Sequence, residues 1–184
     1  MKNHIIGLRI IDIWSNYNSL YFKNSETIKD PAYFKQFKRT ILNKTILSAE
    51  RRAKNILINI SGGNTILIHM KMTGHLLYGH FKYIKSNKKD PWEAIEPESL
   101  KDPFNKRIRF VITFNNNRHL ALSDTRRFAK ITVVNSEIIH QSKHHRAYQK
   151  TNERCEKKGC DGTIKRIVVG GRATHYCDKH QTIL

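Results

Sequence analysis

The sequence is short of cysteine, proline and acidic residues. Its 184 residues include three cysteines, four prolines and 15 aspartates and glutamates. Three cysteines are too few, and odd in number, for a disulfide framework, so we expect a reducing cytoplasm and thiols that bind a metal. No apolar run approaches the ~18 residues that span a bilayer. Arg9 and Asp12 interrupt the apolar stretch near the N-terminus, which argues against a secretory signal.

Basic residues far outnumber acidic ones. The chain has 34 lysines and arginines against 15 acidic residues, which gives a formal net charge of +19. Because self-repulsion of such a surplus opposes compaction, a polyanionic partner is the simplest explanation. The charge therefore indicates a nucleic-acid-binding protein. Hydrophobic residues make up 39% of the chain and fall in periodic segments, which excludes a disordered protein.

Short alternating segments dominate residues 1–135. Residues 5–14 alternate apolar and polar side chains from Leu8 to Trp14, with one slip at Ile10-Ile11, and predict a half-buried strand. Further strands are predicted over residues 45–50, 54–60, 65–69, 76–84, 107–114, 119–123 and 129–134. Asp30 as N-cap and Pro31 at the first helical position predict one helix that ends near Asn43. About eight strands and one helix favour a mainly β domain, a β-sandwich or a barrel.

Two segments lack this pattern. Residues 85–106 are polar, carry three of the four prolines and predict a long loop. Residues 136–154 combine histidines and basic residues with little apolar periodicity, and predict a linker or a short basic helix. We therefore expect a β-sandwich over 1–135, a basic linker over 136–154 and a small module over 155–184.

The last segment carries the clearest motif. Cys155, Cys160, Cys177 and His180 follow the spacing C-x4-C-x16-C-x2-H. A structural zinc site takes four thiolate or imidazole ligands in a closed tetrahedron. Two ligand pairs, with a hairpin turning at 170–171 between them, predict a zinc ribbon whose single structural Zn²⁺ supplies its folding free energy. The alternative is three unrelated thiols beside surface histidines, but all three cysteines fall in this one window.

Three stretches in the same order resemble one family. They are RRAKNILINISGGNTILIHMKMTGHLL (51–77), LSDTRRFAKI (122–131) and the module ending in GGRATHYCDKHQ (155–181). They are similar to the formamidopyrimidine-DNA glycosylase / endonuclease VIII family of base-excision repair enzymes. The loop DPWEAIEPESLKDPFNK (90–106) also resembles some bacterial members. The resemblance implies a β-sandwich and a zinc ribbon, removal of oxidised purines, and strand nicking at abasic sites.

The resemblance also implies roles for single residues. Lys54 matches the lysine that contacts DNA phosphate beside the lesion. Met72 matches the wedge that fills the gap left by a flipped base. Arg126 and Phe128 match the other two void-filling residues, and Arg127 between them belongs to the same expected DNA-binding segment.

The C-terminal module carries further matches. Arg172 matches the ribbon arginine that clamps phosphate at the lesion. Cys155, Cys160, Cys177 and His180 match the zinc ligands, with His180 where a fourth cysteine is usual. Histidine ligates zinc well, so this departure is mild.

These residue types suit the role on physical grounds as well. Flipping a base costs a few kcal/mol of unstacking, and an apolar or planar wedge fills the hole. Met72 follows a predicted strand end, and Arg126 and Phe128 flank Arg127, so in an extended segment they would share a face. The alternatives are that Met72 and Phe128 are core residues and that the basic run at 51–54 is a solvated surface.

The N-terminus and the middle of the chain depart from the family. The family begins Met-Pro-Glu-Leu-Pro, where the proline is the nucleophile and the glutamate the acid/base. This chain begins MKNHIIGLRI, and residues 136–154 stand where the family has a helix-two-turn-helix domain. We therefore expect impaired base excision. A lysine amine forms the same Schiff base, which makes Lys54 the candidate for weak nicking of ready-made abasic sites.

Three hypotheses follow. The first is a reduced member of the repair family, a monomer that binds damaged or abasic double-stranded DNA in the bacterial cytoplasm, at the nucleoid, and not at a membrane. The second is a non-catalytic, zinc-dependent DNA-binding module or a gene fragment. The third is a general basic RNA- or DNA-binding ribbon protein whose MTG and RRF motifs are fortuitous. In-frame upstream codons for Pro-Glu-Leu-Pro-Glu-Val would favour the enzyme.

Overall fold

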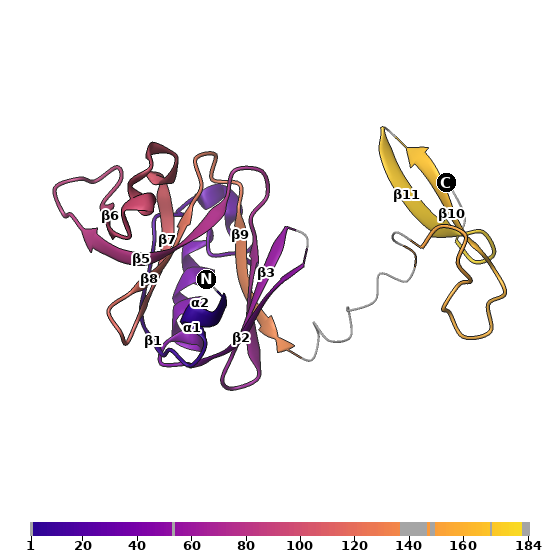
Figure 1. The fold of residues 1–184 in the computed structure, drawn as a ribbon, viewed down its shortest axis with the longest axis horizontal. Helices are drawn as coiled ribbons and strands as arrows, with labels where there is room; N and C mark the ends of the chain where they lie inside the picture. Colours follow the sequence, from indigo (N-terminus) through magenta and orange to yellow (C-terminus); the bar gives the residue numbers. More distant parts are fainter. Residues whose placement is uncertain (1, 53, 137–146, 148–149, 170, 182–184) are drawn as a thin grey trace. The chain divides into compact units, whose positions relative to one another are not determined.

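The fold has two compact units, Met1–Glu137 and Ile138–Leu184. A computed structural model describes residues 2–52, 54–136, 147, 150–169 and 171–181 of the chain (Figure 1). The helices among these residues are too short or too polar to cross a membrane. Most of the predicted linker, 136–154, lies outside the described residues, so its boundaries stay a prediction.

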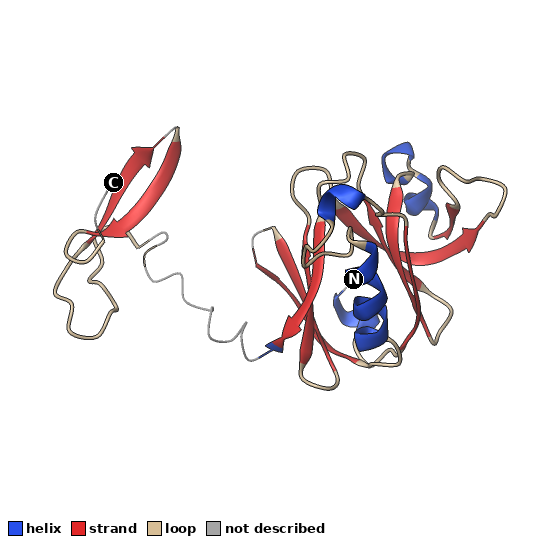
Figure 2. Cartoon of the chain, turned by 180° about the vertical axis from the view of Figure 1, so that it is seen from behind, coloured by secondary structure: helices blue, strands red, loops and turns tan. Residues whose placement is uncertain are grey.

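Two antiparallel sheets build the first unit (Figure 2). In spatial order, the five-stranded sheet contains β1 (Ile10–Ser15), β7 (Ile108–Phe114), β8 (His119–Ser123), β5 (His75–Tyr83) and β6 (Trp92–Glu96). The four-stranded sheet contains β2 (Ile46–Arg52), β3 (Asn55–Ile60), β4 (Asn64–His69) and β9 (Lys130–Asn135). The predicted mainly β sandwich is confirmed.

The core lies between the two sheets. Phe110 and Leu122 come from the five-stranded sheet, Ile58 and Ile66 come from the other, and all four are fully buried. Period-two alternation explains this, since every second side chain of a strand points to the same face.

Helix α2 (Pro31–Ile41) begins and ends where its sequence predicts. The Asp30 carboxylate accepts a hydrogen bond from the Ala32 amide at 2.9 Å, and Pro31 needs no donor at this position. Phe37 and Ile41, one helical turn apart, are buried in the sandwich core. The helix ends at Ile41 with Leu42 as its C-cap, and Asn43 follows in a left-handed conformation, with a φ of 61°.

The N-terminal segment differs from its prediction. Residues 5–14 are not one strand, because α1 (Lys2–Ile5) ends at a turn and β1 starts only at Ile10. Gly7 has a φ of 82°, which favours glycine and separates the two elements. The alternation that predicted a strand is correct only from Ile10 onward.

The predicted loop over 85–106 contains structure. Strand β6 lies between Pro91 and Pro97 and pairs with β5, and two short 3₁₀ helices, η2 (Glu98–Lys101) and η3 (Pro103–Asn105), follow it. A further one, η1 (Leu20–Phe22), precedes α2. Proline is tolerated at the ends of an edge strand, and Trp92 packs its ring against Trp14 and Tyr83.

The second unit contains the predicted hairpin. Strands β10 (Ile164–Val169) and β11 (Arg172–Cys177) pair antiparallel, with Ile164 opposite Cys177 and Val169 opposite Arg172. Gly171 lies in a turn before β11, with a φ of 74°.

Candidate nucleic-acid interface and metal centre

A tight turn presents Met72 to solvent. Residues 70–74 connect β4 to β5, and the Gly74 amide donates to the Met70 carbonyl at 3.1 Å. A Cβ on Gly74 would lie 2.6 Å from that carbonyl oxygen, so only glycine fits there. Met72 at the tip is 72% exposed, which overturns the alternative that it fills the core.

The loop over 124–129 presents Arg126 and Phe128. The segment is not extended as predicted, because Arg127 is left-handed, with a φ of 56°. The two flanking side chains still meet, with the Arg126 guanidinium carbon 4.6 Å from the Phe128 ring centroid in a cation–π contact. Phe128 is 45% exposed and is not a core residue, and Arg126 and Arg127 are exposed.

Asp124 joins the two loops. Its carboxylate is fully buried and accepts from the Thr73 hydroxyl at 2.6 Å, the Tyr17 hydroxyl at 2.7 Å and the Ala129 amide at 2.8 Å. The Arg126 amide also donates to the Thr73 hydroxyl at 3.4 Å. Met72 and the Arg126–Phe128 pair therefore stand on neighbouring loops that share one buried anchor.

Buried polar groups underlie this anchor. Burial raises the pKa of Tyr17 above its ordinary value, and its hydrogen bond to Asp124 raises it further. Lys29 is buried, and its ammonium lies 4.7 Å from the centroid of the Phe22 ring. It donates a hydrogen bond to the Arg127 carbonyl at 2.8 Å. Burial lowers the pKa of Lys29, while the nearby carboxylate of Asp124 opposes that shift. The hydrogen bond from Lys29 thus stabilises the left-handed turn at Arg127.

Lys54 lies in the turn between β2 and β3. Its carbonyl accepts from the Met70 amide at 3.0 Å, which places its backbone next to the Met72 turn, and its side chain is exposed. Beside it, burial lowers the pKa of His69, and the positive charge of Lys71 lowers it further. We call Lys54, Met72, Arg126, Arg127 and Phe128 the wedge surface.

Arg172 belongs to the other unit. It is the first residue of β11, and its side chain lies outside the described part of the structure. Its expected phosphate contact therefore stays a prediction.

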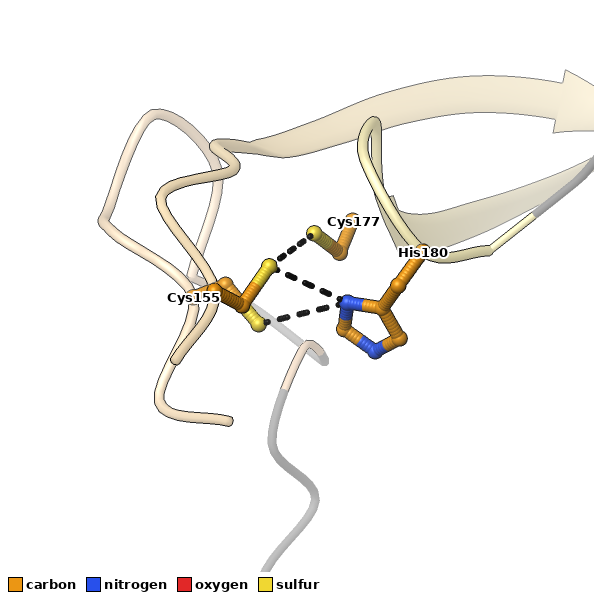
Figure 3. A group of neighbouring side chains, drawn as sticks. Cys155, Cys177 and His180 are labelled. Atoms are coloured by element: carbon orange, nitrogen blue, oxygen red, sulfur yellow. Dashed lines mark hydrogen bonds between the residues drawn. The ribbon is translucent and has the colours of Figure 1, made fainter. Parts of the chain in front are cut away.

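The four predicted metal ligands converge (Figure 3). The Sγ atom of Cys160 lies 3.6 Å from the Sγ of Cys177 and 3.3 Å from Nδ1 of His180. The Sγ atom of Cys155 lies 3.8 Å from the same nitrogen, and all four donor atoms are within 4.8 Å of one another. Sulfurs ~2.3 Å from a tetrahedral zinc stand ~3.8 Å apart, so this set fits such an ion.

Backbone amides favour the thiolate form of Cys177. Burial raises the pKa of Cys177, but the amides of Lys179 and His180 and the neighbouring thiols lower it by more in total, so its net shift is downward. A Cβ on Gly162 would lie 2.5 Å from the Cys177 sulfur, so glycine is required for this close approach. Together, Cys155, Cys160, Cys177 and His180 form a cluster that can hold a metal ion, in a module with few buried apolar residues.

Comparison with known proteins decides the family. The sequence model of the formamidopyrimidine-DNA glycosylase N-terminal domain matches residues 2–131. The chain belongs to the formamidopyrimidine-DNA glycosylase family.

Individual relatives agree with this assignment. The formamidopyrimidine-DNA glycosylase of Pelotomaculum thermopropionicum is 30% identical over 104 residues, which cover 56% of this chain and 31% of that protein. The glycosylase of Rickettsia bellii is 23% identical over 141 residues, covering 77% of this chain and 41% of that protein. The chain thus spans less than half the length of these relatives.

A solved structure shares the fold. The Lactococcus lactis formamidopyrimidine-DNA glycosylase, bound to DNA containing an AP site, aligns with a TM-score of 0.53 at 15% identity, covering 99% of this chain and 95% of that one. The same glycosylase with DNA containing FAPY-dG gives a TM-score of 0.54. At this identity the comparison supports the glycosylase fold alone.

Sequence reasoning missed the groups that support the wedge surface. The available sequence signal was Asp124, the first residue of the DTRRF motif. An aspartate at the end of an apolar strand needs hydrogen-bond partners if it is buried. Tyr17 and Lys29 carried no signal, because they lie about 100 residues from the loop that they hold.

Proposed function

We propose that this chain is a damaged-DNA-binding base-excision repair protein that binds duplex DNA where a base is missing or flipped out. The observation that carries the proposal is the pair of anchored loops holding Met72, Arg126 and Phe128 at the surface. Solvent exposure of a methionine and a phenylalanine on preorganised turns is explained if they enter a void in the DNA stack.

Each side chain would have a distinct task. Met72 is flexible and apolar, which suits the gap left by an extruded nucleotide. The Arg126 guanidinium can hydrogen-bond the edge of the orphaned base, and Phe128 can wedge into the neighbouring base step. Lys54 and Arg127 would contact phosphate, as would Arg172 of the second unit.

We propose that the second unit binds one structural Zn²⁺ through Cys155, Cys160, Cys177 and His180. The donor chemistry and spacing support zinc over a hard cation, since thiolates and imidazole are its preferred ligands. The bound ion would supply the folding free energy that the small apolar cluster of Cys155, Ile164 and Cys177 lacks.

Chemistry at the DNA is a further part of the proposal. The Lys54 amine would attack the C1′ aldehyde of an abasic site, and water would leave to give an imine. Loss of a C2′ proton to water would then break the C3′–O bond and expel the 3′ phosphate by β-elimination. Within the described residues of the two wedge loops, 70–74 and 124–129, the one carboxylate is Asp124. It is buried and uses both oxygens as acceptors, so it is not poised to protonate a departing base.

That observation also favours the second candidate, a non-catalytic zinc-dependent DNA-binding module. In either form we propose that the protein acts as a monomer on chromosomal DNA in the bacterial cytoplasm. The two candidates differ in whether DNA is cut, and they share the same binding surface.

Equilibrium binding at several salt concentrations tests the proposal. Affinity for a duplex with an abasic-site analogue should exceed that for the intact duplex, and log K should fall with log salt by about 0.9 per phosphate neutralised. An affinity that is independent of salt, or equal for the two duplexes, would rule out damaged-DNA binding.

A further inference from the structure

An exposed aromatic stack lies beside the wedge surface. The rings of His75, the first residue of β5, and Phe104 in η3 are stacked, with centroids 4.7 Å apart and an interplanar angle of 13°. Phe104 nevertheless remains 67% exposed. Because His75 covers one face of the ring, the other face is open to solvent.

Local hydrogen bonds fix the orientation of this stack. His75 Nε2 forms a hydrogen bond with Asn105 Oδ1 at 2.9 Å, and the side-chain nitrogen Nδ2 of Asn105 donates to the Leu100 carbonyl at 3.2 Å. The Asp102 carboxylate accepts from the Phe104 amide at 2.7 Å, which caps the short helix that carries the ring. A ring held in this way loses little conformational entropy when it binds a ligand.

The stack is continuous with the wedge surface. His75 Nδ1 lies 3.4 Å from the carbonyl of Thr73, the residue that follows Met72. Two exposed lysines belong to the same two segments, Lys71 in the Met72 turn and Lys106 directly after η3, and the exposed Asp102 carboxylate caps η3. An exposed aromatic ring that adjoins a basic surface matches the chemistry of sites that stack nucleobases along a phosphate backbone.

We propose that Phe104, backed by His75, is a stacking platform for an unpaired nucleobase of the DNA bound at the wedge surface. The inference rests on the proposed function and adds a second contact to it. Met72 and Phe128 fill a void inside the duplex, whereas Phe104 receives a base that has left the duplex. Continuity with the basic wedge surface, through the contact of His75 with Thr73, favours DNA over an apolar protein segment as the occupant.

Binding to three duplexes tests the platform. One is intact, one carries an abasic-site analogue and one carries a single bulged 2-aminopurine, whose fluorescence is quenched by stacking. Phe104→Ala should weaken binding to the bulged duplex roughly 5- to 150-fold and restore its fluorescence, because one base–aromatic stack is lost. Binding to the intact duplex should not change, and Phe104→Trp should retain wild-type behaviour.

Leu47→Ala is the matched control, since Leu47 is another exposed apolar side chain (57%) on β2. Equal affinity of wild type and Phe104→Ala for the bulged duplex would overturn the platform, while an abasic preference in the same samples would leave the proposed function standing. Equal losses on all three duplexes would also overturn it, since they would show a general contact. A wild-type protein without abasic preference would overturn both.

Discussion

The hydroxyl of Thr73 donates a hydrogen bond to the fully buried carboxylate of Asp124 across 2.6 Å. Through this bond the turn after β4 and the loop after β8 share one anchor. The side chains at their tips, Met72 on one and Arg126 with Phe128 on the other, are thereby fixed relative to each other before any DNA arrives. Preorganisation of this kind lowers the entropic cost of binding.

Replacing Thr73 tests that anchor. Thr73→Val keeps the shape of the side chain but leaves a buried carboxylate oxygen without its donor, which should cost ~1–3 kcal/mol in the free energy of unfolding. Denaturant unfolding measures this, and the preference for abasic DNA should fall in parallel. Thr73→Ser keeps the hydroxyl and should behave as wild type. A fully stable Thr73→Val protein would show that the bond does not hold the loops together.

Zinc binding should stabilise the fold of the second unit only. Elemental analysis of protein purified without chelator should find one zinc per chain, and Cys177→Ser should abolish it. Amide spectra should then show residues 155–181 unfolded and the β-sandwich intact, because the two units have separate cores. Zinc-free wild-type protein with a folded ribbon would contradict the metal assignment.

Gly162 gives a finer test of the same centre. A Cβ at this position would approach the Cys177 sulfur to 2.5 Å, so Gly162→Ala should weaken zinc retention against a chelator although every ligand remains. Gly159→Ala introduces backbone strain without such a clash, because Gly159 has a φ of 78° and its Cβ would meet nothing within 4 Å. Equal zinc retention in Gly162→Ala and wild type would show that the sulfur can shift.

The sequence predicted those parts of the fold whose signals are local. Strand alternation and the Asp30-Pro31 helix start depend on neighbours within a few residues, and the helix start and most of the strands were confirmed. The paired spacing brought four possible metal ligands together. The prediction for 85–106 was wrong, because its prolines suggested a loop. Strand β6 forms there because it pairs with β5 and because the Trp92 ring packs against Trp14. Such contacts connect residues far apart in the chain.

The wedge surface shows the same division. The motifs located Met72 and Arg126, but the reason that Arg126 and Phe128 share a face was wrong. They meet through a left-handed turn at Arg127. Asp124 gave a local signal in the DTRRF motif, but Tyr17 and Lys29 contact this loop over long sequence separations, so no local pattern could reveal them.

His119 should make the β-sandwich sensitive to acid. Burial lowers its pKa below the ordinary 6.5, and the neighbouring His80 lowers it further. Its Nδ1 accepts from the Phe81 amide at 3.3 Å, which requires the neutral ring. A lowered folded-state pKa means that the unfolded chain binds the proton first, so stability is full above about pH 6.5 and falls as pH drops below it.

Thermal unfolding between pH 7.5 and pH 5 measures this effect. The melting temperature of the wild type should fall with pH, and His119→Asn should show a shallower fall. His4→Asn, which removes an exposed histidine of the same unit, should leave the wild-type slope. Identical slopes for wild type and His119→Asn would contradict the assigned cause.

Covalent trapping separates the two candidate functions. Sodium borohydride should trap a protein adduct with pre-formed abasic DNA, and Lys54→Ala should abolish it. Excision of oxidised guanine from intact duplex should be negligible, because general acid–base help worth ~10²–10⁴-fold is not supplied by the described wedge loops. An adduct that persists in Lys54→Ala would move the chemistry to another amine, with Lys71 next, and robust excision would refute the argument from Asp124.

The most direct test of the central claim compares two affinities in one variant. In Met72→Ala/Phe128→Ala, both exposed apolar side chains of the wedge surface are removed and its basic residues are kept. We predict that this variant binds intact duplex as the wild type does but loses the wild-type preference for a duplex with an abasic-site analogue. Loss of a stacking contact is worth ~1–3 kcal/mol, which fluorescence anisotropy resolves easily. An undiminished preference for abasic DNA in the double variant would contradict the account.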